Sequence, residues 1–148
     1  GERCLDFGDL VVYFDEGLET HLKELRLAAL PNETGGILLG YHDFNIGAIV
    51  VVDALPAPAD SCASPVDFER GTSGLLAAVQ EVSRRTAGIV GYVGEWHSHP
   101  RGHSASPSQD DLFQLVEISL GMHDDGLPAL QLIVGEGDIR VLQGAVRT

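Results

Sequence analysis

Short apolar runs of strand length alternate along this chain with segments of helical periodicity. The strand-like runs are rich in β-branched residues and cover residues 10–14, 35–40, 48–52, 89–93, 129–134 and 139–146. Apolar residues recur at helical spacing in residues 16–30, 72–85 and 108–122. This interleaving predicts an α/β fold in which a mixed β-sheet is flanked by helices.

The length and composition of the chain favour one folded unit. Its 148 residues match the size of an ordinary domain, and 44% of them are hydrophobic, so a disordered chain is a poor explanation. We therefore expect a single domain over residues 1–148. Residues 56–65 are rich in Pro, Ala, Ser and Asp, and they are expected to form a loop.

Charge and cysteine content bear on the partners and the compartment. The formal net charge of -13 opposes contact with phosphate backbones, so nucleic acid is not an expected partner. No apolar run approaches the roughly 20 residues that a membrane helix needs, and no secretory leader is recognisable. Cys4 and Cys62 do not form a CxxC pair, which is typical of ordinary thiols in a reducing compartment. We expect a cytoplasmic protein without a membrane partner.

Two histidines follow directly after the strand-like run at residues 89–93. Side chains two apart in an extended backbone point the same way, so His97 and His99 can both reach one metal ion. Asp111 falls in the first turn of the helix predicted over residues 108–122. Two imidazoles and one carboxylate form a common catalytic zinc set that leaves a fourth position for water. The HxH pair alone would be a weak signal.

A hydrolytic zinc site also needs a proton acceptor and a donor for the oxyanion. Glu33, between the first predicted helix and the Gly35-Gly36 run, is the first candidate for the acceptor, and Glu95 is the second. Ser108 is a candidate donor to the oxyanion of a tetrahedral intermediate. Ser108 and Asp111 could instead form a helix-capping pair. The remaining histidines are interpreted as surface residues: His21, His42, His103 and His123.

Three segments together resemble the JAB/MPN family with its JAMM signature. They are Glu33-Thr34-Gly35-Gly36-Ile37-Leu38-Leu39-Gly40, Gly94-Glu95-Trp96-His97-Ser98-His99-Pro100 and Ser108-Gln109-Asp110-Asp111. The signature consists of a distant glutamate, HxHP, and a serine three residues before an aspartate. The resemblance implies a cytidine-deaminase-like α/β fold with one catalytic zinc ion. It also implies cleavage of amide or isopeptide bonds after the C-terminal tail of a ubiquitin-like protein.

The resemblance further implies a role for each matching residue. His97, His99 and Asp111 would be metal ligands, Glu33 the general base and Ser108 the oxyanion stabiliser. Asp110 is the alternative to Asp111, which is preferred because it keeps the Ser-x-x-Asp register.

The segments Phe68-Glu69-Arg70-Gly71 and Tyr92-Val93-Gly94-Glu95-Trp96-His97 are most similar to the bacterial JAB branch. That branch is found beside E1-like and E2-like enzymes, so the implied partners are these enzymes and a ubiquitin-like protein or its conjugate. Both deconjugation and maturation of a precursor are compatible with the resemblance. A non-catalytic MPN-type scaffold or binding module is the alternative from a different class, although such relatives typically lack the zinc ligands.

Overall fold

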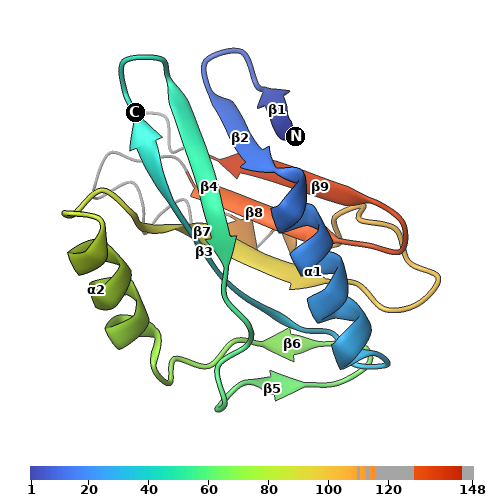
Figure 1. Ribbon diagram of the computed structural model, residues 1–148. Helices are drawn as coiled ribbons and strands as arrows, with labels where there is room; N and C mark the ends of the chain where they lie inside the picture. The colour runs from blue at the N-terminus through green and yellow to red at the C-terminus, as the bar shows by residue number, and fades with distance from the viewer. Residues whose placement is uncertain (110, 113, 116–128, 145–148) are drawn as a thin grey trace.

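The computed structural model describes residues 1–109, 111, 112, 114, 115 and 129–144 (Figure 1). Its helices are α1 (Glu16–Ala29) and α2 (Leu75–Arg85). Its strands are β1 (Glu2–Asp6), β2 (Val11–Asp15), β3 (Gly35–Asp43), β4 (Ala48–Ala54), β5 (Cys62–Ala63), β6 (Phe68–Glu69), β7 (Gly91–Ser98), β8 (Ala129–Val134) and β9 (Ile139–Gly144). The described residues from 109 to 115 are also helical.

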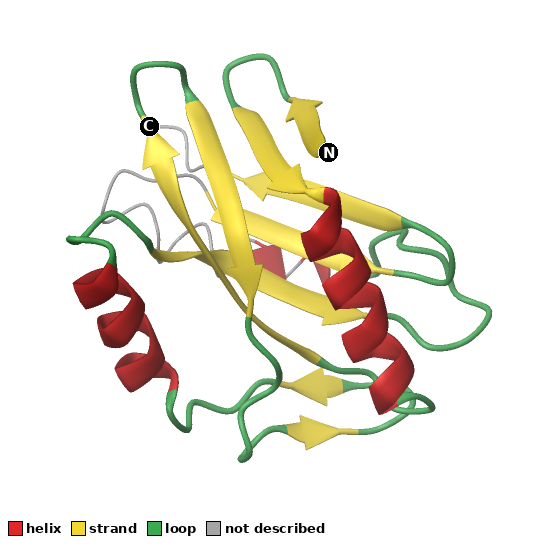
Figure 2. Ribbon diagram, in the orientation of Figure 1, coloured by secondary structure: helices red, strands yellow, loops and turns green. Residues whose placement is uncertain are grey.

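Seven of these strands form one mixed sheet in the order β1-β2-β4-β3-β7-β8-β9. The β2–β4 and β7–β8 pairs are parallel, and the other neighbours are antiparallel. Figure 2 shows α1 lying across this sheet and α2 lying apart from α1. Helix α2 packs against the central strands β3 and β7. The α/β prediction of a mixed sheet flanked by helices is confirmed.

Most predicted elements recur with shifted ends, and the largest shift is in β7, which continues five residues past the predicted run to Ser98, so that His97 lies within the strand. The helix expected over residues 108–122 is helical at its described residues from 109 to 115, with Ser108 just before it, and its remainder lies outside the described residues, as do residues 145 and 146 of the predicted last strand. Strand β1 was not predicted. The loop expected over residues 56–65 contains β5, which pairs with β6 in a short hairpin.

The larger core lies between α1 and the sheet. Leu18 and Leu22 stand one turn apart on α1 and are buried in one cluster with residues of β2, β3, β4, β7, β8 and β9. Trp96 in β7 is 1% exposed, and its indole N–H donates to the Leu55 carbonyl at 2.8 Å. A smaller core around Ile37 lies on the α2 side. Because side chains alternate along β7, Trp96 faces the larger core and His97 faces the opposite side of the sheet.

Two glycines allow β3 to lie close to its neighbours. A Cβ added to Gly35 would stand 2.4 Å from the Trp96 carbonyl oxygen and 2.8 Å from the Phe68 ring. A Cβ added to Gly36 would stand 2.2 Å from the Leu55 carbonyl oxygen. Real Cβ atoms do not occupy such positions, so glycine is required for this packing. The β5–β6 hairpin thereby reaches the start of β3, as Figure 1 shows below the end of the main sheet.

Three further expectations concern the surface. Both cysteines are free and exposed. Among the residues that the structure describes, no helix is long and apolar enough to cross a membrane. The interpretation of His21 and His42 as surface residues is wrong, because both are half-buried. Nε2 of His21 lies 3.0 Å from the Ala54 carbonyl oxygen, and the spacing of apolar residues in the sequence could not reveal this contact. His103 is exposed, and His123 lies outside the described residues.

Candidate metal centre and the surrounding cleft

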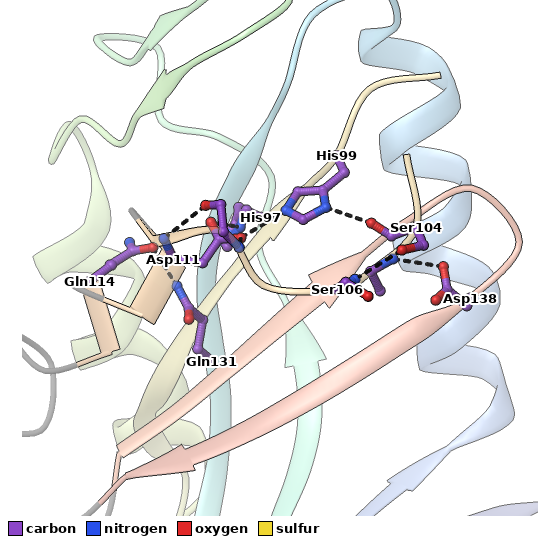
Figure 3. A network of polar contacts seen from close by, with 10 residues as sticks. His97, His99, Ser104, Ser106, Asp111, Gln114, Gln131 and Asp138 are labelled. Atoms are coloured by element: carbon purple, nitrogen blue, oxygen red, sulfur yellow. Dashed lines mark hydrogen bonds and ion pairs between the residues drawn. The ribbon is translucent and has the colours of Figure 1, made fainter. Parts of the chain in front are cut away.

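Three side chains from two separate segments meet at the end of β7. The Nε2 atom of His97 lies 2.7 Å from Oδ1 of Asp111, and Nε2 of His99 lies 2.9 Å from Oδ2 of the same carboxylate. One ligand atom of each residue lies within 4.8 Å of the other two. Figure 3 shows His97, His99 and Asp111 gathered together. Such a group can hold a metal ion. Asp110 lies outside the described residues.

The ring of His99 is oriented by its other nitrogen. Nδ1 lies 2.6 Å from the Ser104 carbonyl oxygen, which can only accept a hydrogen bond. Nδ1 therefore donates to this carbonyl, and Nε2 is the ring nitrogen that faces Asp111 and could bind a metal ion. A backbone carbonyl in this role is a common way to fix the tautomer of a histidine that binds metal.

Asp111 is held at the start of its helix by Ser108. Its Oδ2 accepts from the Ser108 backbone N–H at 2.8 Å, and its own backbone N–H donates to Ser108 Oγ at 3.1 Å. This is a reciprocal N-terminal cap, so the capping pair considered from the sequence is present. The cap leaves Asp111 Oδ1 free for other partners, and it uses Ser108 Oγ as an acceptor. The Ser108 hydroxyl proton is thus still available to donate.

The charges and the polar groups of this cluster fit a cation. Burial alone would raise the pKa of Asp111, but contacts from the two imidazoles and the Ser108 N–H outweigh it, so this pKa lies well below its usual range. The same contact has the opposite effect on His99, because the neighbouring Asp111 carboxylate raises the pKa of this imidazole. Neither ring nitrogen of buried His97 makes a well-oriented hydrogen bond within the described part of the chain. A metal ion would satisfy both the carboxylate charge and the buried His97 nitrogen.

Glu33 lies in the same cleft, and no described residue pairs with its carboxylate. Its backbone N–H donates to the Ser64 carbonyl oxygen at 2.9 Å, which joins this residue to the β5–β6 hairpin. Its side chain makes no hydrogen bond or ion pair to another described residue. Burial raises the pKa of Glu33, while the nearby His97 and His99 oppose that rise. An unpaired carboxylate of this kind is well suited to exchange protons.

Glu95 is held in a different environment. Its Oε1 accepts from Nε of Arg70 at 2.5 Å, and its Oε2 accepts from the Tyr92 hydroxyl at 2.6 Å. The side chain is 5% exposed. Burial raises the pKa of Glu95, and the contacts with Tyr92 and Arg70 oppose that rise. Both oxygens already have partners, so Glu95 serves to connect β7 to the end of the hairpin.

These groups surround an open cleft of about 690 Å³, a volume in the range of small-ligand and peptide sites. Glu33, His97, His99 and Asp111 lie together on one side of it. Residues of the β5–β6 hairpin also line it, as do Ser104, Ser106 and Gln114. All five residues predicted from the sequence line this one cleft.

Comparison with known proteins assigns the family. The family model described as prokaryotic homologs of the JAB domain matches residues 15–142. This chain belongs to the prokaryotic JAB family. A curated relative, the CD-NTase/cGAS isopeptidase of Enterobacter hormaechei subsp. hoffmannii, is 38% identical to this JAB protein over 125 residues. That alignment covers 84% of this chain and 67% of the relative.

A solved structure supports the fold of this JAB protein. The solution structure of a protein from Desulfitobacterium hafniense matches it with a TM-score of 0.62 at 23% identity. The match covers 90% of this chain and 82% of the other. At this identity the likeness concerns the fold alone, and it agrees with the JAB/MPN fold that the sequence implied.

Ser98, between the two histidines of this JAB protein, is a site residue that sequence reasoning missed. It is fully buried, and its backbone N–H donates to the Thr34 carbonyl oxygen at 2.7 Å. Its Oγ accepts from the Thr34 N–H at 2.9 Å. Thr34, which follows Glu33, is therefore bonded to Ser98, which lies between the candidate metal ligands His97 and His99. Strand alternation gave the only available signal, because it points Ser98 away from the face of His97 and His99.

Proposed function

We propose that this protein is a zinc-dependent isopeptidase that cleaves the amide bond joining the C-terminal tail of a ubiquitin-like protein to a CD-NTase/cGAS-type enzyme. The close meeting of His97, His99 and Asp111 beside an unpaired carboxylate carries this proposal. The name of the Enterobacter relative supports the substrate class. Partner E1-like and E2-like enzymes would form such conjugates.

The donor set supports zinc as the ion. Two imidazole nitrogens and one carboxylate oxygen match the ligands of catalytic zinc sites with an open fourth position. His97, His99 and Asp111 would hold the ion. A bound zinc ion would lower the pKa of a coordinated water to about 7 and polarise the carbonyl of the scissile bond.

The remaining roles fall to residues of this chain. Glu33 takes a proton from the attacking water and later delivers it to the leaving amine, since its carboxylate has no other described partner. Ser108 donates its hydroxyl proton to the developing oxyanion, because its Oγ already accepts from the Asp111 N–H and its proton is unassigned. The occupied oxygens of Glu95 favour Glu33 over Glu95 as the base.

The experiment uses a ubiquitin-like protein joined through its C-terminal carboxyl to a lysine of a CD-NTase. We expect the zinc-loaded protein to release both partners intact, with masses that place the cut directly after the tail. Glu33→Gln is expected to lower the rate by about 100- to 10,000-fold, the usual contribution of a general base, while one zinc per chain remains bound. Glu24→Gln is the matched control, because Glu24 is exposed on α1 and does not line the cleft.

Three results would contradict the proposal in different ways. Full cleavage by the Glu33→Gln protein would remove Glu33 from the role of base. Failure of the unmodified protein to bind stoichiometric zinc would instead favour a non-catalytic scaffold. Cleavage of a linear precursor in preference to the conjugate would favour maturation over deconjugation.

A further inference from the structure

One arginine is buried in an otherwise apolar helix face. Leu18, Leu22 and Arg26 recur at a spacing of four on α1 and are its three buried residues. Arg26 is 6% exposed. Burying a guanidinium group is costly unless its N–H groups find acceptors. The acceptors of Arg26 therefore show which part of the structure the buried side chain holds in place.

The acceptors are the backbone carbonyls immediately after β7. Nε of Arg26 donates to the His99 carbonyl oxygen at 2.8 Å, and Nη2 donates to the Pro100 carbonyl oxygen at 3.2 Å. Within the described part of the chain, no carboxylate forms an ion pair with Arg26. Hydrogen bonds from a charged donor are about twice as strong as neutral ones, so both carbonyls are firmly held. Arg26 lies in the last turn of α1, where the helix dipole also favours its positive charge.

Arg26 provides one of three contacts that hold His99 in place. Strand β7 ends at Ser98, so the backbone of His99 lies beyond the regular pairing of the strand. Its N–H donates to the Val134 carbonyl oxygen at 2.8 Å, and its ring is held by the Ser104 carbonyl oxygen. Arg26 supplies the only hydrogen bond that the described residues make to the His99 carbonyl. The backbone N–H, the backbone carbonyl and Nδ1 are then all occupied, and Nε2 is directed at Asp111.

We propose that Arg26 is a positioning residue for the metal ion, acting through the backbone of His99. The inference rests on the proposed function, in which His99 is a metal ligand. Residues that orient the ligands of a metal typically contribute about 10- to 100-fold to metal affinity. Arg26 does so from the far end of α1, 73 residues away in the sequence. It does not line the cleft.

The test measures metal binding by the full chain. Arg26→Met keeps the apolar stem and removes every donor, and Arg26→Lys keeps the charge and one donor position. Zinc dissociation constants are measured by competition with a chromophoric chelator, and cobalt-substituted protein is examined by visible absorption. We expect Arg26→Met to weaken zinc binding by about 10- to 100-fold and to change the cobalt spectrum, with Arg26→Lys intermediate.

Lys23→Met is the matched control. Lys23 lies on the same helix, is about half exposed and makes only a 3.8 Å ion pair with Glu19, so its replacement removes the same charge without touching His99. This variant should bind zinc and cobalt like the unmodified protein.

The outcomes distinguish positioning from a general effect on stability. An Arg26→Met protein that melts at a lower temperature, but keeps the zinc affinity within twofold and the cobalt spectrum, would overturn the inference. If Arg26→Met does not fold, unaltered zinc affinity of Arg26→Lys would overturn it equally. An unmodified protein that binds no zinc would refute the proposed function and, with it, the role of Arg26.

Discussion

Replacement of Gly35 by alanine tests how closely β3 must approach the site. The added Cβ would lie 2.4 Å from the Trp96 carbonyl oxygen, 2.8 Å from the Phe68 ring and 3.1 Å from the His97 Cα. Favourable contacts between heavy atoms begin at about 3.5 Å, so the strands must separate by about 1 Å. Two of the three neighbours are backbone atoms of β7, and they cannot rotate away.

The expected cost of Gly35→Ala follows from that displacement. Overpacking of a well-packed interior typically costs about 1–3 kcal/mol. For a chain of this size each kcal/mol lowers the melting temperature by about 2–4 °C. A displacement of about 1 Å at catalytic groups can lower a rate by about 100-fold. The variant should therefore lose both stability and cleavage activity, with activity affected more severely.

Gly91 provides the matched control for this replacement. It lies in β7 as well, but an added Cβ would meet no atom within 4 Å, and its φ angle is not in the left-handed region. Gly91→Ala should change the free energy of unfolding by less than about 0.5 kcal/mol. Trp96 is the sole tryptophan and is buried, so its fluorescence reports thermal unfolding of both variants. A Gly35→Ala protein that melts at the same temperature as the Gly91→Ala protein and cleaves at the normal rate would refute the reasoning.

Two further replacements test other contacts. Trp96→Phe removes the indole donor from the Leu55 carbonyl and should destabilise the fold by about 1–3 kcal/mol, measured by circular dichroism in a urea titration; an unchanged midpoint would show that the bond contributes nothing. Burial lowers the pKa of His42 below its usual value of about 6.5. As the pH falls, His42 is therefore protonated at a higher pH in the unfolded chain than in the folded protein. The free energy of unfolding decreases as the pH falls below 6.5. His42→Gln should lose less stability than the unmodified protein between pH 7.5 and 5.5, and equal losses would contradict this assignment.

The parts of the fold that could be predicted are those with a periodic apolar face. Leu18 and Leu22 identified α1, and the apolar runs identified the central strands. Strand β1 has no such pattern because its residues are exposed except for partly buried Leu5. The β5–β6 hairpin has only two residues in each strand, and it depends on packing against Gly35 rather than on local preference.

The candidate site divides in a similar way. Alternation along one strand predicts that His97 and His99 share a face, because this is a local property of the backbone. The tautomer of His99 depends on the Ser104 carbonyl, and no sequence pattern encodes that contact. Arg26 did leave a signal, since it occupies the next position in the apolar repeat of Leu18 and Leu22. A charged residue at a position of the buried helix face predicts that its side chain has polar partners in the interior.

The pairing of β3 with β7 explains why the candidate base and the candidate ligands lie together. Gly35 is opposite His97 in the antiparallel register, and Thr34 is bonded to Ser98 through both backbone and side chain. The same register continued by one pair places Glu33 opposite His99. Residues two apart share a face, so Glu33 and the two imidazoles lie on the same face as Gly35. A side chain at position 35 would lie on that face directly opposite His97, with its Cβ 3.1 Å from the His97 Cα, which is a reason for glycine there besides the approach of the strands. Separation of the two strands would move Glu33 away from the metal ligands, so stability and proton transfer should decline together in variants of this strand pair.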